Sequence, residues 1–193
     1  IGKAVINTFL KSKKNFIINV DNLTYASSHG PLKNLSEKDG YIFEKANISD
    51  KKKITKIFNK YKPDAIIHLA AESHVDRSID SSVDFIKTNI LGTHNLLEVT
   101  RAYLLNRRKG FKFFHVSTDE VYGDLDNKKN GFTEKNSYLP SSPYSATKAS
   151  ADHLVRAWHR TYKMPVLISN CSNNYGSYQF PEKFIPHIIL NAI

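Results

Sequence analysis

Short apolar segments alternate with longer amphipathic segments along most of this chain of 193 residues. The short segments have the length of strands, and the longer ones repeat their apolar residues at helical spacing. This alternation predicts a parallel sheet with helices on both faces, because parallel strands need a crossover connection. We therefore predict an α/β fold with a doubly wound, Rossmann-like parallel sheet. The expected strands are 15–20, 41–45, 64–69, 111–117 and 165–169.

The segments between the expected strands carry helix signals. Asp50 stands where its side chain can cap one helix, and Pro143 opens another. The polar segment 124–142 before Pro143 is expected to be a loop. The expected helices cover 5–10, 54–58, 83–106 and 144–162.

Composition indicates a single globular domain, with 40% hydrophobic and 24% charged residues. The chain opens at Ile1 and its only methionine is Met164. We therefore expect residues 1–193 to be one Rossmann-like domain that is incomplete at both ends. It would lack the first strand of the sheet, the glycine-rich phosphate loop after that strand, and the C-terminal substrate region. These residues alone are expected to be inactive.

The charge and the cysteine content exclude several classes of protein. The formal net charge is +10, but the lysines are scattered and not interleaved with stacking aromatics, which favours an anionic small substrate over nucleic acid. Cys171 is the single cysteine, so the chain forms no internal disulfide, which fits the cytoplasm. No apolar run has the length of a membrane span. The histidines and Cys171 show no metal-binding spacing, so no metal is expected.

Residues at the expected strand ends are the first candidates for a ligand site, because ligands of such sheets bind beyond the carboxyl ends of the strands. Asp21 follows the strand 15–20, where an acid can accept both ribose hydroxyls of adenosine and favours NAD over NADP. A turn or helix cap is the alternative for this residue. Ala70 and Ala71 follow the strand 64–69, where small side chains serve either a flat cofactor or helix–sheet packing.

Tyr144 and Lys148 are four residues apart, on one face of the helix expected at 144–162. A nearby ammonium stabilises phenolate, so Lys148 is expected to lower the pKa of Tyr144 towards the range of a general base. The spacing alone is common. Its place after the strand that ends in Ser117 and Thr118 is more specific. Hydroxyl, phenol and ammonium then meet at one strand end, as hydride transfer from a sugar hydroxyl requires.

Two acids, Asp119 and Glu120, come directly after the apolar strand 111–117. A solvated polar turn is the ordinary explanation for such a pair. Adjacent carboxylates in unlike surroundings can also hold different protonation states, so the pair can supply an acid and a base to one substrate.

These motifs resemble the extended short-chain dehydrogenase/reductases, which act on nucleotide sugars. Within that family, the blocks VDNLTYA, HLAAESHVDRSI, FIKTNILGT, HVSTDEVYG, PYSATKA and SNNYG followed by QFPEKFIP are similar to the dTDP-glucose 4,6-dehydratase subgroup. They run from residue 20 to 186. The Thr-Asp-Glu triplet marks this subgroup, since related epimerases and GDP-mannose dehydratases carry other residues where Asp119 stands.

The resemblance implies an NAD-dependent lyase that converts dTDP-glucose to dTDP-4-keto-6-deoxyglucose with no net redox change. Tyr144, assisted by Lys148 and Thr118, would take the proton of the sugar 4-hydroxyl as hydride moves from C4 to NAD. Glu120 would remove the C5 proton, while Asp119 would protonate the C6 hydroxyl so that it leaves as water. Return of hydride to C6 completes the reaction.

The resemblance also implies binding residues. Asn47 stands where the family has aspartate beside adenine, which bears on cofactor affinity rather than on activity, and Ser177 replaces a proline. The residues expected to contact NAD are Asp21, Asn22, Leu23, Thr24, Asn47, Ile48, Leu69, Ala70, Ala71, Glu72, Ser73, Thr88, Tyr144, Lys148 and Asn174. Those expected to contact the nucleotide sugar are Ser73, Thr118, Asn173, Lys183, Phe184 and Ile185.

Other functions stay open. Another nucleotide-sugar dehydratase or an epimerase of the same family would share most of these motifs, because the base and sugar are read largely by residues after 193. A non-catalytic NAD-binding protein of the same fold would need neither Tyr144 and Lys148 nor the acid pair. The resemblance implies a homodimer, with the helices expected at 83–106 and 144–162 pairing across it.

Overall fold

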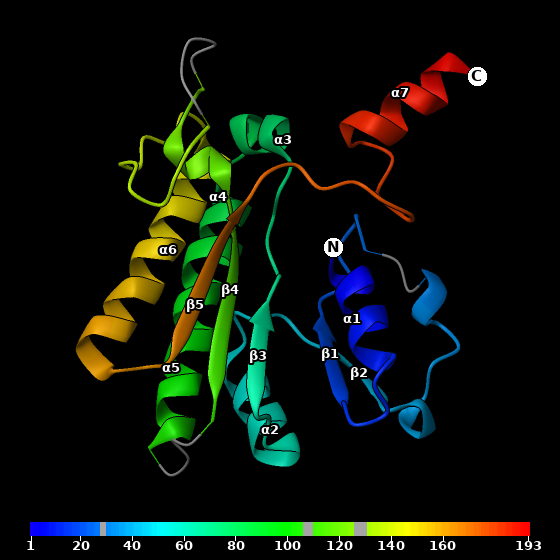
Figure 1. Ribbon diagram of the computed structural model, residues 1–193, viewed down its shortest axis with the longest axis vertical. Coiled ribbons are helices and arrows are strands. Elements are labelled where there is room, and N and C mark those ends of the chain that lie inside the picture. The colour runs from blue at the N-terminus through cyan, green and yellow to red at the C-terminus, as the bar shows by residue number, and fades with distance from the viewer. Residues whose placement is uncertain (28–29, 106–109, 126–130) are drawn as a thin grey trace. The chain divides into compact units, whose positions relative to one another are not determined.

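The structure is a computed structural model that describes residues 1–27, 30–105, 110–125 and 131–193 (Figure 1). Its contacts divide the chain into two compact units. The first unit contains Ile1–Ala46 and Asn173–Ile193, and the second contains Asn47–Ser172. The expectation of one incomplete domain over residues 1–193 stays a prediction.

The first unit is built around a pair of parallel strands. Strand β1 (Ile17–Asp21) pairs with β2 (Tyr41–Lys45), with Ile17 opposite Tyr41. Ile6, Leu32 and Tyr41 form its buried apolar cluster. The unit also contains helices α1 (Gly2–Leu10) and α7 (Phe184–Ala192), and short 3₁₀ turns at Gly30–Leu32 and Glu37–Asp39.

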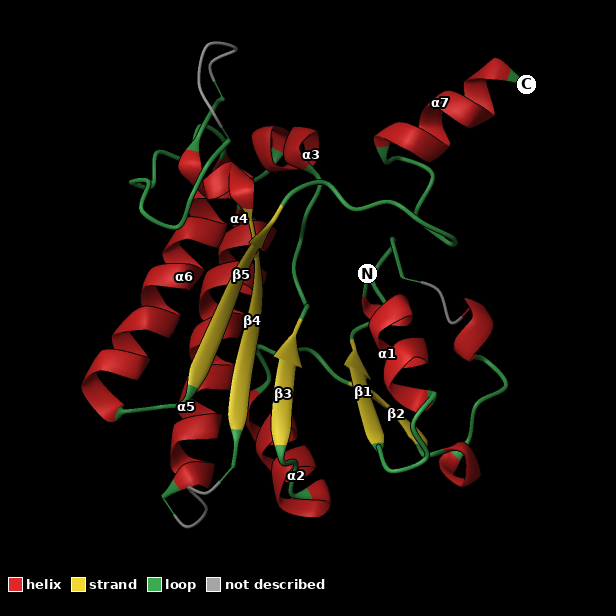
Figure 2. Ribbon diagram, in the orientation of Figure 1, coloured by secondary structure: helices red, strands yellow, loops and turns green. Residues whose placement is uncertain are grey.

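The second unit contains a three-stranded parallel sheet of order β3-β4-β5, drawn in yellow in Figure 2. His68 of β3 lies opposite His115 of β4, and Thr118 of β4 lies opposite Cys171 of β5. The carboxyl ends of these strands therefore meet at one edge of the sheet. The strands are β3 (Ala65–His68), β4 (Lys112–Thr118) and β5 (Val166–Cys171).

Helices α5 and α6 lie against one face of this sheet (Figure 1). Strand β4 turns Phe113, His115 and Ser117 into the interior, and each of them is buried. The run after α3 starts as an α-helix, widens to a π-helix at Ile86–Gly92, and returns to an α-helix. The helices of this unit are α2 (Lys51–Tyr61), α3 (Val75–Asp80), α4 (Val83–Phe85), α5 (Thr93–Leu104) and α6 (Pro143–Tyr162).

The expected α/β fold with parallel strands is confirmed, and all five strands lie within two residues of their expected positions. In the part of the chain that the structure describes, β1 and β3 belong to separate sheets. Asp50 caps α2, since its Oδ1 accepts a hydrogen bond from Lys53 N at 3.0 Å. Helices α3 and α7 were not expected.

Two expected boundaries fall on undescribed residues. The long helix predicted to end at 106 is seen from Val83 to Leu104, and residues 106–109 lie outside the described ranges. The same holds for 126–130 of the expected loop. None of the helices within the described ranges is long and apolar enough to cross a bilayer.

Candidate active site

The end of β4 presents a hydroxyl and two carboxylates in a tight turn. Thr118 caps a 3₁₀ turn, Asp119–Tyr122, where its Oγ1 accepts a hydrogen bond from Glu120 N at 3.3 Å. The same hydroxyl donates to Asp119 Oδ1 at 3.4 Å. Thr118 is buried, whereas Asp119 and Glu120 are half-buried. The acids are thus drawn back against the sheet and are not a fully solvated pair.

Gly123 ends this turn in a conformation that favours glycine. Its φ is 91°, and its N–H donates to Glu120 O at 3.2 Å. A Cβ at this position would collide with the carbonyl oxygen of Leu139, whose N–H donates to Val121 O at 2.9 Å. Gly123 therefore lets a second backbone segment lie directly against the turn that carries the acids.

Helix α6 brings Tyr144 and Lys148 to the same place. Both side chains are buried, at 9% and 4% exposure. Lys148 Nζ donates to the carbonyl oxygen of Val116 in β4 at 2.8 Å. The first turn of α6 is fixed by Ser142, whose Oγ accepts from Ser145 N at 3.0 Å, and by Ser78 Oγ of α3, which accepts from Tyr144 N at 3.1 Å.

The surroundings of Tyr144 raise the pKa of its phenol, which is the opposite of the expected direction. Burial has the largest effect, and the nearby charges of Glu120 and Asp119 act in the same sense. A hydrogen bond with Thr118 lowers the pKa and only partly compensates. The expectation considered the ammonium alone, but the site also desolvates the phenol and sets two carboxylates beside it. Tyr144 is therefore protonated in the unliganded site.

Burial also lowers the pKa of Lys148, to about 8, against opposing effects of Asp152 and Cys171. Its ammonium is retained at neutral pH by a modest margin. Thr118 and Glu120 are thus close enough to Tyr144 to share a hydrogen bond with its phenol or to affect its pKa. Lys148 is held at the same strand by its bond to Val116 O.

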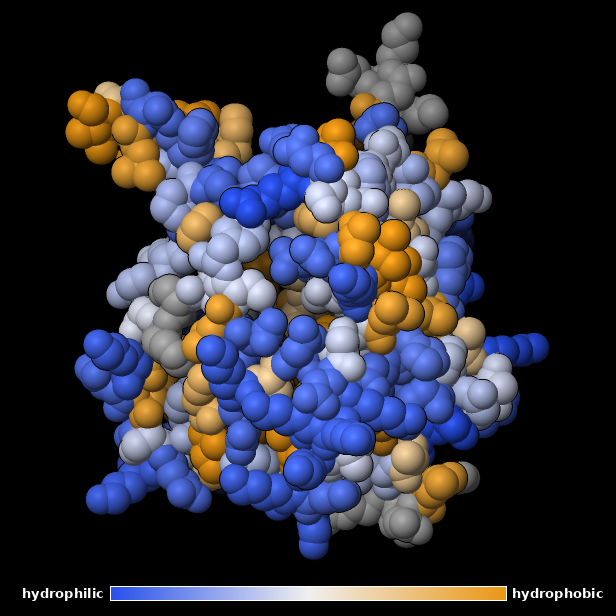
Figure 3. Space-filling model, turned by 180° about the vertical axis from the view of Figure 1, so that it is seen from behind, coloured by the Kyte–Doolittle hydropathy of each residue, from blue (hydrophilic) through white to orange (hydrophobic). Residues whose placement is uncertain are grey.

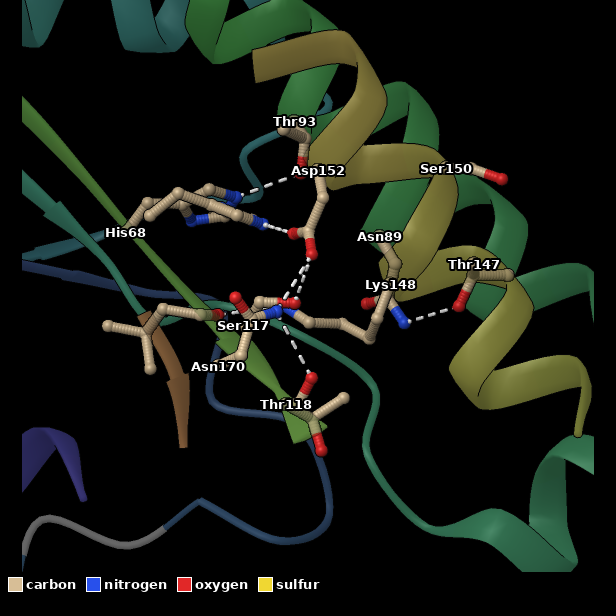
Figure 4. A network of polar contacts seen from close by, with 12 residues as sticks. His68, Asn89, Thr93, Ser117, Thr118, Thr147, Lys148, Ser150, Asp152 and Asn170 are labelled. Atoms are coloured by element: carbon tan, nitrogen blue, oxygen red, sulfur yellow. Dashed lines mark hydrogen bonds and ion pairs between the residues drawn. The ribbon is translucent and has the colours of Figure 1, made fainter. Parts of the chain in front are cut away.

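The loop after β3 is joined to α6 by Asn89, a residue that the sequence analysis missed. Asn89, in the π-helical segment, accepts from Glu72 N and donates to Glu72 O, both at 2.9 Å. Its Nδ2 also lies 2.9 Å from Thr147 Oγ1, which in turn donates to Tyr144 O at 2.7 Å. One buried amide therefore connects the expected cofactor loop to the helical turn between Tyr144 and Lys148 (Figure 4).

The residues expected to contact NAD are divided between the two units. In the second unit, Asn47 and Ile48 precede α2, and Thr88 lies in the π-helical segment. Ile48 is buried, and Asn95 Nδ2 donates to its carbonyl oxygen. The remaining residues of this unit are Leu69, Ala70, Ala71, Glu72 and Ser73, after β3, with Tyr144 and Lys148 on α6.

In the first unit, Asp21 ends β1, and Asn22, Leu23 and Thr24 follow it. Asp21 Oδ1 accepts from Leu23 N at 2.7 Å and from Ser27 Oγ at 3.0 Å, so the alternative role of turn cap is seen in the structure. A carboxylate offers about four acceptor positions, so this role leaves room for ribose hydroxyls. Asn174 also belongs to this unit.

The residues expected to contact the sugar nucleotide are divided in the same way. Ser73 and Thr118 lie in the second unit, whereas Asn173 and 183–185 lie in the first. Lys183 precedes the first turn of α7, where Phe184 is exposed and Ile185 follows it. No group of three or more His, Cys, Asp or Glu side chains within the described ranges could hold a metal ion.

Comparisons with known proteins show the family of this chain. The family model described as GDP-mannose 4,6 dehydratase matches residues 1–193. The chain belongs to this family. It is 54% identical to the dTDP-glucose 4,6-dehydratase of Salmonella typhimurium over 205 residues, covering 100% of this chain and 57% of that protein. The chain therefore spans a little over half the length of the curated relatives that it matches.

Solved structures of related dehydratases and epimerases share this family's fold. A dTDP-glucose 4,6-dehydratase from Streptomyces venezuelae, with NAD and TYD bound, has a TM-score of 0.86 and 38% identity, covering 99% of this chain and 56% of that one. A UDP-glucuronic acid 4-epimerase from Bacillus cereus, in complex with UDP-glucuronic acid and NAD, also has a TM-score of 0.86, with 25% identity. It covers 100% of this chain and 59% of the epimerase. The Rossmann-like class predicted for the chain is thereby confirmed.

Proposed function

We propose that the whole protein is an NAD-dependent lyase that converts dTDP-glucose to dTDP-4-keto-6-deoxyglucose. The observation that carries this proposal is the gathering of Thr118, Asp119 and Glu120 around Tyr144. Thr118 hydrogen bonds with the phenol, and both acids influence its pKa. A protein that only binds NAD has no need of a desolvated phenol between two carboxylates.

In the oxidation step, the Tyr144 phenol first releases its own proton to solvent as substrate binds, and the resulting phenolate takes the proton of the sugar 4-hydroxyl. The lysine ammonium, held by its bond to Val116 O, favours negative charge on that oxygen, and the Thr118 hydroxyl stabilises it by hydrogen bonding. When bound, NAD accepts the hydride from C4 and later returns it to C6.

In the elimination step, the two acids have different tasks. The ketone at C4 makes the C5–H bond acidic, and the Glu120 carboxylate takes this proton. Asp119 gives a proton to the C6 hydroxyl, which leaves as water, and the C5–C6 double bond forms. In the final reduction C6 gains the hydride, and Glu120 returns its proton to C5, so that substrate loses one water overall. Two acids on successive residues can reach adjacent carbons of one sugar.

The residues present in each unit fit NAD by their chemistry. Asp21 supplies a carboxylate at the end of β1 for ribose hydroxyls, and Ala70 and Ala71 are small side chains after β3 that admit a flat ring close to the backbone. Asn47 already uses its Oδ1 to accept from Ser49 N at 2.8 Å. Its amide Nδ2 remains the group to face an adenine nitrogen, which supports the proposal that this substitution alters affinity and not the reaction.

The test is to incubate the whole protein with NAD and, separately, dTDP-glucose, GDP-mannose and UDP-glucose, and to identify the products. A 4-keto-6-deoxy sugar from dTDP-glucose, formed without net NADH, is expected. An epimerised hexose, or the same deoxy product from GDP-mannose alone, would instead assign one of the other activities of the family. Binding of NAD without turnover of any sugar would contradict the enzymatic proposal.

We further propose that the whole protein is a homodimer in the cytoplasm. Val83, Ile86 and Leu91 are exposed at 54%, 43% and 54%, and apolar residues gather over α4 and the start of the helical run that follows it (Figure 3). Leu91→Glu is expected to convert the dimer to monomer in sedimentation equilibrium, whereas Lys56→Glu on α2 should leave it intact. A wild-type monomer would refute the dimer, and secretion of the protein in the native cell would refute the location.

A further inference from the structure

Helix α6 carries a third ionisable residue on the face that presents Tyr144 and Lys148. Asp152 follows Lys148 by four residues, as Lys148 follows Tyr144, so the three side chains share one helical face. Asp152 has 0% exposure. A carboxylate at such a depth is costly unless its oxygens accept hydrogen bonds and a cation lies nearby.

One carboxylate oxygen of Asp152 joins three separate segments (Figure 4). Oδ2 accepts from Ser117 Oγ of β4 at 2.8 Å, from Tyr138 OH at 2.9 Å and from Asn170 Nδ2 of β5 at 3.3 Å. Asn170 Nδ2 also lies 3.3 Å from the carbonyl oxygen of Thr118. Asp152 therefore fastens α6 to the strand ends on which the site is built.

The other carboxylate oxygen faces a buried histidine. Oδ1 lies 3.1 Å from His115 Nε2, in a direction that falls short of a well-aligned hydrogen bond. Burial, helped by the charge of Lys148, lowers the pKa of His115 despite the opposing effects of Asp152. The neighbouring ring of His68, 5.1 Å away, has its pKa lowered well below the usual value, chiefly by burial. Both imidazoles are therefore neutral at neutral pH, whereas Asp152 acts to raise the pKa of Lys148, four residues before it on α6.

We infer that Asp152 is a positioning residue for the oxidation step: its buried carboxylate fastens α6, and with it Lys148, to the ends of β4 and β5, and it supplies a negative charge one helical turn from the Lys148 ammonium. The inference rests on the proposed function, in which that ammonium assists Tyr144. Asp152 contacts no reacting atom in this scheme and acts through Lys148. Burial alone would remove the proton from Lys148 more readily, and Asp152 opposes this effect.

Other ionisable groups face Asp152 and Lys148 from the elements packed against them, and their titrations can be distinguished from that of Lys148. Burial raises the pKa of both Tyr122 and Tyr138, so these phenols stay neutral when Lys148 titrates. The groups that face Asp152 or Lys148 are His68 of β3, His115 of β4, Tyr122 of the turn after β4, Tyr138 of the segment before α6 and Cys171 of β5.

The direct test is an NMR titration of the whole protein with labelled lysine side chains, in which Lys148→Met assigns the Lys148 signal. Asp152→Asn keeps the shape of the side chain and removes the charge. Its Lys148 pKa is expected to fall by about one unit or more below the wild-type value. Ser117→Ala is the matched control, because it removes one hydrogen bond of Asp152 and leaves the charge, so the Lys148 pKa should be unchanged.

An unchanged Lys148 pKa in Asp152→Asn would overturn the inference, and so would an equal fall in Ser117→Ala. If Asp152→Asn does not fold, Asp152→Glu decides. Retention of the wild-type Lys148 pKa in this charged variant supports the inference, and a fall overturns it.

Kinetics separate this inference from the proposed function. In single turnover with dTDP-glucose and NAD, the alkaline loss of the NADH-forming rate should move to lower pH in Asp152→Asn, by the same amount as the Lys148 pKa. If Asp152 served packing alone, Asp152→Asn would lower the rate at every pH, and the pH at which the rate is lost would stay the same. That result would refute the inference. Absence of NADH formation in the wild-type protein would refute the proposed function and leave the titration result standing.

Discussion

Lys148 Nζ and the carbonyl oxygen of Val116 are 2.8 Å apart, and this hydrogen bond fixes the ammonium two residues before Thr118. The bond joins the central strand of the second unit to the second turn of α6. It gives a flexible side chain one orientation, so the charge stands at a set place before any ligand arrives. The same burial that orders Lys148 also makes its charge costly.

Replacing Lys148 by methionine should therefore lower the activity and raise the stability of the fold. Burial lowers its pKa from the usual 10.5 to about 8, so the unfolded state binds the extra proton between these values. Wild-type stability should rise with pH across that window, and Lys148→Met should lack this rise. At pH 7 the variant should be more stable by about 2 kcal/mol, after allowing for the lost hydrogen bond. Urea unfolding at a series of pH values measures the free energy of unfolding of the wild type and of Lys148→Met. If this free energy changed with pH in the same way in both proteins, the lowered pKa of Lys148 would be contradicted.

Tyr144→Phe removes the phenol oxygen and leaves the ring, which lies with its centroid 6.4 Å from that of Phe85. We expect turnover to fall by roughly 10²–10⁴-fold, which is the usual contribution of general acid–base catalysis. The melting temperature should change little, because the packing is retained. Tyr162→Phe, at the exposed far end of α6, is the control and should keep full activity. A Tyr144→Phe variant with more than half the wild-type rate would assign the base to another group.

Glu120→Gln should separate oxidation from elimination. The variant is expected to form NADH and hold it in the enzyme, because the C5 proton is no longer removed, and no deoxy sugar should appear. Asp119→Asn is the comparison, and should slow the loss of water less completely, since a solvent molecule can partly replace a general acid. NADH absorbance follows the oxidation step, and rapid-quench product analysis follows the elimination step. Together they distinguish Glu120→Gln from Asp119→Asn. Normal turnover by Glu120→Gln would exclude it as the C5 base.

Gly123→Ala tests how the turn of acids is supported. The new methyl group must meet the carbonyl oxygen of Leu139 while the backbone keeps a φ of 91°. We expect a loss of about 2–4 kcal/mol in stability, with an activity loss from displacement of Glu120. Gly110→Ala has a similar φ of 80° but no atom of the described residues within 4 Å of the added carbon, so it should lose only about 1 kcal/mol. Equal losses in the two variants would show that backbone conformation alone matters.

The sequence predicted the strands well because each is an apolar run with polar residues at its ends. The predicted strand 41–45 matches β2, and Pro143 marked the start of α6 correctly. Helix α7 was missed because Phe184 and Ile185 were considered only as ligand contacts. Helix α3 was missed because six residues give too short a periodic pattern.

The site was predicted in composition but not in electrostatics. Thr118, Tyr144 and Lys148 were expected at one strand end because parallel strands bring their carboxyl ends together. The direction of the Tyr144 pKa shift was wrong, because desolvation depends on what covers a side chain and not on its neighbours in the sequence. Asn89 makes its hydrogen bonds with Glu72 and Thr147, which are 17 and 58 positions away in the sequence. No local sequence pattern could therefore predict its role. The spacing of Tyr144, Lys148 and Asp152 could have indicated the third residue.

The π-helical segment Ile86–Gly92 makes the site sensitive to chain length. A π-helical turn is equivalent to an α-helix with one additional residue. Deleting one residue there would let the helix run on as a regular α-helix, which would remove the widened turn that holds Asn89. Asn89 would then leave Glu72 and Thr147, although no residue that touches a ligand had been replaced. Relatives that differ by one insertion or deletion in this stretch should therefore hold the loop after β3 in another way, even where every catalytic residue is the same.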